Sequence, residues 1–129
     1  MRIEGHHRRW NASDETALED VLRFRDDFGG AQFWITDDDD PFPAVAIRLS
    51  GDFADVHYFP HDGHPGFRAL AETPPPAGQT TTFIYEGCDP PTGEETPSEF
   101  VLLASTAIDV AKEFQRTGTR SPVLSWFEL

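Results

Sequence analysis

The sequence predicts an α+β domain, in which an antiparallel meander sheet of about five to six strands carries one N-terminal and one C-terminal helix. Apolar residues recur at helical spacing near both ends of the chain, and the middle is rich in β-branched and aromatic residues. The connections between the central strands are too short for parallel crossovers. A chain of 129 residues can bury one modest core, so residues 1–129 are expected to form a single domain.

The first expected helix lies within residues 11–30. Asn11 or Ser13 can cap it, the acidic residues that follow suit the positive end of the helix dipole, and Gly29 and Gly30 end it. This helix needs a sheet or a second helix to pack on, because its apolar residues share one face: Ala17, Leu18, Val21, Leu22 and Phe28.

Five central segments have the composition of strands and are separated by turn-forming residues. They are residues 31–36, 43–50, 53–59, 66–71 and 79–87. Val45, Ile47 and Leu49 alternate with less apolar residues, so one face of the second strand is expected to be buried. Only Gly51 and Asp52 separate the second strand from the third, which favours a tight antiparallel hairpin.

The C-terminal part is expected to be as ordered as the centre. The spacing predicts a helix over 105–117, capped by Ser105 or Thr106. Gly118 stands where a left-handed residue commonly ends a helix, and residues 123–127 can then pair with the sheet. The face of this helix that is expected to be buried consists of Ala107, Ile108, Ala111 and Phe114.

The chain is strongly acidic, with 23 Asp and Glu against 10 Lys and Arg, a formal net charge of −13 and a pI near 4.5. Direct binding to nucleic acid or to an anionic membrane is therefore disfavoured. The acids are densest in Asp37–Asp40 and from Glu86 to Glu99, most of which reads as a polar, proline-rich loop over 87–99. Such segments suit either a solubilising surface or a face for a basic partner.

No motif in the sequence indicates an enzyme. The nucleophile-elbow, phosphate-loop, dinucleotide and zinc-protease patterns do not occur, and Cys88 lies among acids that make it a poor nucleophile. As the single cysteine, Cys88 cannot form an internal disulfide. With neither a secretory signal nor an apolar run long enough for a membrane span, a cytoplasmic protein is expected.

The strongest metal-binding candidate is the set His57, His61 and His64, because zinc sites use closely spaced imidazoles. His57 belongs to an expected strand, whose successive residues face opposite ways, and this argues against a shared site. No metal or other cofactor is therefore expected. Asp37–Asp40 lack the interleaved ligands, central glycine and distant glutamate of a calcium loop, so they read as a solvated turn.

The C-terminal segment combines an alanine-rich helix, an aromatic residue, a Thr-Gly pair, a turn with Arg and Pro, and a Trp in the expected last strand. The residues of this pattern are Ala107, Ala111, Phe114, Thr117, Gly118, Arg120, Pro122 and Trp126. In this pattern the segment resembles the first-numbered immunity family of bacterial polymorphic toxin systems. Ser121 separates Arg120 from Pro122, which are usually adjacent in the family. The segments "YFPHDGHPGFRAL" and "FIYEG" are also similar to the family's middle strands.

The resemblance implies a small α+β immunity protein that binds and silences a cognate toxin in the cytoplasm. The toxin would be a nucleic-acid deaminase or nuclease with a basic active-site cleft, which an acidic inhibitor could block. The alternative is a small metal-dependent or ligand-binding module that uses His57, His61 and His64. The residues expected to contact the toxin are the acids of the two dense segments and the aromatic residues beside them: Asp37, Asp38, Asp39, Asp40, Phe42, Tyr85, Glu86, Asp89, Glu94 and Glu95. The matched Phe114, Gly118, Pro122 and Trp126 are expected to build the fold.

Overall fold

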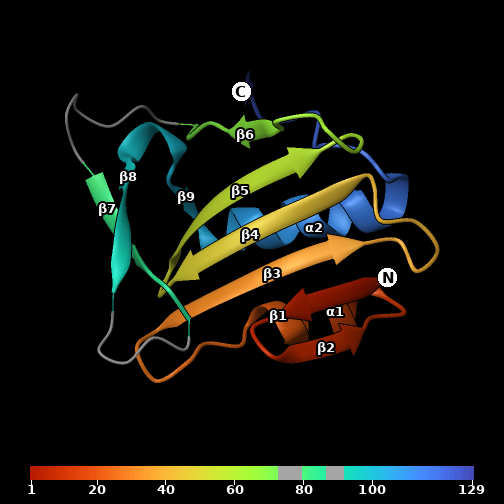
Figure 1. Ribbon diagram of the computed structural model, residues 1–129, viewed down its shortest axis with the longest axis horizontal. Helices are drawn as coiled ribbons and strands as arrows, with labels where there is room; N and C mark the ends of the chain where they lie inside the picture. Colours follow the sequence, from red (N-terminus) through yellow and green to blue (C-terminus); the bar gives the residue numbers. More distant parts are fainter. Residues whose placement is uncertain (73–79, 87–91) are drawn as a thin grey trace.

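The computed structural model describes residues 1–72, 80–86 and 92–129. It is an α+β fold in which an eight-stranded antiparallel sheet carries both helices on one face, as Figure 1 shows, and a separate two-stranded hairpin lies at one end. The elements are β1 (Arg2–Gly5), β2 (Arg8–Asn11), α1 (Glu15–Leu22), β3 (Gly30–Thr36), β4 (Ala44–Ser50), β5 (Phe53–Phe59), β6 (Phe67–Ala69), β7 (Thr80–Ile84), β8 (Gly93–Pro97), the 3-10 turn η1 (Ser98–Phe100), β9 (Leu102–Leu103), α2 (Ala104–Thr117) and β10 (Trp126–Glu128).

The strands of the large sheet follow the order β10-β6-β5-β4-β3-β1-β2, with β9 paired to one end of β5. The predicted class is confirmed, and β3 to β6 form the expected antiparallel meander. Val45, Ile47 and Leu49 are buried, as their alternation predicts. Gly51 takes a positive φ of 55° in the tight turn between β4 and β5, where the expected hairpin forms. Within the described residues, no helix is long and apolar enough to cross a bilayer.

Helix α2 packs on β4 and β5 through a row of small residues and one aromatic ring. Ala107, Ala111 and Phe114 are buried as expected, and Gly118 ends the helix with a φ of 72°. The expected caps Ser105 and Thr106 are wrong, because the helix begins directly after β9. No side chain caps it, and the backbone N–H of its first residue, Ala104, instead donates to the carbonyl oxygen of Asp52 at 2.7 Å.

Helix α1 is shorter than expected and lies beside α2. Asp14 caps it by accepting the backbone N–H of Ala17 at 2.8 Å, because Asn11 is the last residue of β2. The helix ends at Leu22 instead of the glycines, where the Arg25 guanidinium donates to the Leu22 carbonyl oxygen at 2.7 Å. Phe28, expected on the buried face, is consequently 55% exposed.

Four strands were not expected from the sequence: β1, β2, β8 and the two-residue β9, which pairs with β5. β1 and β2 form a hairpin at one edge of the sheet from short, charged segments in which Ile3 alone is fully buried. β8 occupies residues 93–97, inside the segment expected to be a loop, and pairs with β7. Thr96 is its one buried residue, so the composition of β8 resembles that of an exposed turn.

The C-terminal segment is fixed at the opposite edge of the sheet, as predicted. Trp126 begins β10, which pairs antiparallel with β6, and its indole N–H donates to the Ser121 carbonyl oxygen at 3.0 Å. The Arg120 guanidinium lies 3.8 Å from the ring centre of Phe67 on β6, while Pro122 is exposed. The chain is therefore fixed to β6 on both sides of the turn between α2 and β10.

Candidate functional site

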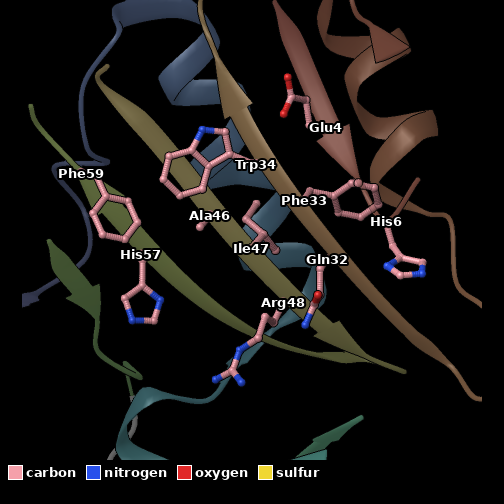
Figure 2. Close-up of a pocket in the computed structure, with 11 residues that line it drawn as sticks. Glu4, His6, Gln32, Phe33, Trp34, Ala46, Ile47, Arg48, His57 and Phe59 are labelled. Carbon is pink, nitrogen blue, oxygen red and sulfur yellow. The ribbon is translucent and has the colours of Figure 1, made fainter. Parts of the chain in front are cut away.

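The face of the sheet opposite the helices is hollowed. A cavity of about 460 Å³, here called the open-face hollow, lies over β1, β3, β4 and β5 (Figure 2). Its formation follows from the strand sequence, since Ala46, Arg48 and Ser50 of β4 turn away from the core and Ala46 has only a methyl group. The residues that line the open-face hollow include Glu4, Trp34, Ala46, Arg48, His57 and Phe59.

An aromatic row forms one side of the open-face hollow. Ala46 lies between Trp34 and His57 in the strand register, and its methyl group leaves room above the sheet. The rings of Trp34 and Phe59 stack with centroids 5.2 Å apart, and His57 stacks on Phe59 at 6.0 Å. Phe42, from the loop after β3, contacts Trp34 edge to face at 6.3 Å. The row is thus continuous from the β3–β4 loop into the middle of β5.

A buried carboxylate lies at the other side of the open-face hollow. Asp55 is fully buried, although it faces away from the helices, and its two oxygens accept from Arg48 and Arg68. The Arg48 Nε–Oδ2 distance is 3.0 Å and the Arg68 Nε–Oδ1 distance is 2.9 Å. Both arginine side chains are largely buried as well. A buried charge without such partners would be costly, so this is a mutually dependent cluster.

The same cluster attaches the β7–β8 hairpin to the sheet. Arg48 donates to the hydroxyl of Thr96 at 3.3 Å and contacts the carboxylate of Glu94 at 3.4 Å. Its guanidinium also lies 5.3 Å from the ring centre of Phe83, which is buried on β7. Arg48 therefore connects the hairpin, through Asp55, to the middle of the meander.

His57 stands between the aromatic row and the charged cluster. Burial lowers the pKa of His57 below its ordinary value of 6.5, and the nearby Arg68 and Arg48 act in the same direction. The carboxylate of Asp55, 3.9 Å from Nδ1, opposes the shift but does not reverse it. The imidazole is therefore neutral at neutral pH.

We expect this histidine to make the protein less stable in mild acid. The unfolded chain binds a proton near pH 6.5 while folded His57 does not, so stability falls as the pH decreases from about 6.5 towards the lower folded pKa. Thermal melts of wild type and His57→Gln across pH 7.5 to 5 measure this difference. The glutamine variant should lose less stability over that range, and parallel curves would contradict the assignment.

The first predicted contact segment reaches the open-face hollow through Phe42, while Asp37 and Asp40 lie near the C-terminal end of α2. Asp37–Asp40 are all exposed in the β3–β4 loop, and Phe42 of the same loop touches Trp34. Asp38 is partly neutralised, since Oδ1 lies 3.1 Å from the amino group of Met1 and accepts from the Asn11 amide at 2.9 Å. In the described parts of the chain, Asp39 and Asp40 form no ion pair.

The second predicted segment lies at the opposite end of β3. Glu86 is only 7% exposed and accepts the backbone N–H of Gln32 at 3.2 Å. Little of its carboxylate is therefore accessible to a binding partner. Tyr85 donates its hydroxyl to Glu94 at 2.8 Å, and Glu95 is exposed on β8. Asp89 and Cys88 lie outside the described residues. Gln32 and Asp37 are five residues apart, roughly 16 Å along a strand, so the two acidic segments are not brought together.

The three histidines of the alternative hypothesis are not assembled. His57 faces the open-face hollow, whereas His61 and His64 contact each other in the β5–β6 loop with ring centres 5.3 Å apart. The Nδ1 atom of His64 accepts the backbone N–H of Gly66 at 2.8 Å, which gives it a role in the turn. Within residues 1–72, 80–86 and 92–129, no group of three or more His, Cys, Asp or Glu side chains could hold a metal ion.

Comparison with known proteins found no family model that matches the chain and no curated protein that matches it significantly. The geometry of the open face and the charge around it are therefore the basis on which a function is assigned. The open face combines an aromatic row and a cavity, and the adjoining β3–β4 loop is acidic and exposed.

Proposed function

We propose that the chain is an immunity protein, which binds a cognate toxin that acts on nucleic acid and neutralises it by blocking its basic active-site cleft. The observation that carries the proposal is the exposure of Asp37–Asp40 in the same loop that places Phe42 against Trp34 of the aromatic row. An acidic rim with an apolar centre is what a basic protein surface requires of its inhibitor. The resemblance of the C-terminal segment supports the same class of protein.

The distribution of ion pairs strengthens the acidic character of this surface. Several of the cations are already held by acids of the same chain: Arg23 and Lys112 by Glu19, Arg116 by Glu15 and Glu113, and Arg48 and Arg68 by Asp55. These pairs lie on the helices and in the buried cluster. The aspartates of the β3–β4 loop therefore retain most of their charge for an external partner, with Asp38 the exception.

The direct test uses the toxin domain that this proposal expects to be encoded beside the gene for this chain. The purified domain is assayed on single- and double-stranded DNA and RNA with increasing amounts of this protein. Activity should fall to zero at equal molar amounts, and the two proteins should elute together as a complex. If a large excess leaves the toxin active, the proposed function is wrong. Complete loss of toxin activity at far below equal molar amounts of this protein would indicate that it is an enzyme instead.

Removing the charge of the β3–β4 loop should slow association with the toxin. We expect the triple variant Asp37→Asn, Asp39→Asn, Asp40→Asn to associate about tenfold more slowly at low salt, with a weaker dependence on salt. Asparagine keeps the side-chain oxygen that accepts the Asp39 N–H, so the turn is retained. Asp38 is left in place because it contacts Met1 and Asn11. Stopped-flow association at two or more salt concentrations measures the effect.

A matched variant removes the same charge from positions outside the β3–β4 loop. Asp20 and Asp109 are exposed on the two helices, and Asp27 is exposed shortly after α1. Converting these three to asparagine should change the association rate much less than the loop variant does. Equal slowing by both variants would show that only the total charge matters, and the β3–β4 loop would lose its assigned role.

A further inference from the structure

The stacked pair of Trp34 and Phe59 differs from the other aromatic groups of the chain. Arginines of the chain lie over several other rings, at 4.0 Å for Arg8 on Phe24, 4.3 Å for Arg68 on Phe100 and 3.8 Å for Arg120 on Phe67. In the described part of the molecule no cation lies over Trp34 or Phe59. Trp is the most favourable ring for such a contact, and this one faces an open cavity.

A carboxylate stands next to the same ring. Glu4 on β1 lies directly opposite Trp34 in the antiparallel register, and Figure 2 shows both on the open face. The side chain of Glu4 is 41% exposed, Arg2 Nε lies 3.9 Å from its Oε1, and Arg9 is its cross-strand neighbour on β2. A cation that stacked on Trp34 would therefore lie near a carboxylate that is still accessible.

The positive groups around the open-face hollow do not oppose such a cation. Arg48 is held by Asp55 and Glu94, so its charge is compensated within the protein. His57 is neutral at neutral pH, because burial lowers its pKa. His6, at the far side of the cavity, is exposed to solvent. Among the residues that line the open-face hollow, Glu4 is therefore the charged group that a cation on Trp34 would meet.

We infer that the open-face hollow receives an arginine side chain from the basic partner, with its guanidinium stacked on Trp34 and facing the carboxylate of Glu4. A planar guanidinium can do both at once, whereas a lysine ammonium is a compact, strongly hydrated point charge. The cavity of about 460 Å³ is large enough for one such side chain. The inference rests on the proposed function for the identity of the partner and adds the group that is recognised.

The first experiment uses a small probe and needs no toxin. Tri-arginine peptide is titrated into the protein at low salt while the three tryptophan indole N–H signals are followed by NMR. We expect a saturable shift of the Trp34 signal, with those of Trp10 and Trp126 little changed. Tri-lysine should bind at Trp34 at least about fivefold more weakly, and neutral tri-citrulline should produce no shift.

Two variants test the geometry without removing Trp34 itself, whose loss could disturb the sheet. Glu4→Gln removes the carboxylate at almost constant shape, and Ala46→Leu fills the floor of the open-face hollow. Each should weaken tri-arginine binding at least about fivefold, while the control Asp109→Asn, exposed on α2, should leave it unchanged. No shift at Trp34, equal shifts of all three indoles, or equal affinity for tri-lysine would each overturn the inference.

The same variants then separate this inference from the proposed function. With the cognate toxin domain, Ala46→Leu should raise the Kd at least about tenfold, mainly through faster dissociation. If wild type and Ala46→Leu inhibit the toxin equally well, the immunity function stands and the arginine site is wrong. If wild type fails to bind the toxin, the proposed function is wrong, and the peptide titration alone decides whether the hollow binds arginine.

Discussion

Replacing Phe114 by alanine is expected to lower the free energy of unfolding by about 3–5 kcal/mol, the usual cost of a large cavity in a core. Phe114 is 2% exposed on α2, and its ring meets Tyr58 of β5 edge to face with centroids 6.2 Å apart. The surrounding alanines are too small to fill the space it would leave. Since domains of this size are stable by about 5–15 kcal/mol, most of the margin would be lost.

Urea unfolding followed by circular dichroism measures this loss, with Phe28→Ala as the matched control. Phe28 is the same residue type but is 55% exposed, so its truncation should cost much less than that of Phe114. If Phe114→Ala and Phe28→Ala shift the unfolding midpoint by similar amounts, the packing of α2 on the sheet is not a principal source of stability.

Replacing Asp55 by alanine is expected to destabilise the protein by a similar amount, about 3–5 kcal/mol, for an electrostatic reason. The change would leave Arg48 and Arg68 without their shared carboxylate in a largely buried position. Asp52→Ala, an exposed aspartate in the turn of the same hairpin, is the control and should have little effect on the sheet. Thermal or urea unfolding of the two variants provides the comparison.

The cause can be separated from simple loss of packing. The triple variant Asp55→Leu, Arg48→Met, Arg68→Met removes the two arginine charges together with their carboxylate. It should recover much of the stability that Asp55→Ala loses. Hydrogen exchange of the β8 amides should accelerate in the triple variant, because Thr96 and Glu94 lose their contact with Arg48. A triple variant less stable than Asp55→Ala would contradict the role assigned to the buried charge.

The strands of the meander could be predicted because their residues alternate over one buried face. Val45, Ile47 and Leu49 point to the core, and a turn of two residues fixes β4 against β5. The β1–β2 hairpin could not be predicted in the same way. Its segments are short and charged, and they become strands because β3 offers a free edge to Arg2–Gly5.

The candidate site could be predicted only in part. The tight hairpin already places Arg48 opposite Asp55, so that pair was accessible from the sequence. Arg68 reaches the same carboxylate after a loop whose path no local pattern gives. The open-face hollow joins Glu4, Trp34 and Phe59 from three strands, and such a long-range arrangement leaves no signal in composition. Exposure of Asp37–Asp40 followed from their turn chemistry, whereas burial of Glu86 depended on the contact with Gln32.

The placement of both helices on one face of the sheet has a consequence for how such a protein can diversify. Residues that point towards α1 and α2 are constrained by the core, while their immediate neighbours along β3 and β4 face the opposite way. A sequence lineage could therefore exchange residues around Ala46 and in the β3–β4 loop without losing the fold. Tolerance to substitution would alternate from one residue to the next along these strands, and a new specificity could arise while the architecture stayed the same.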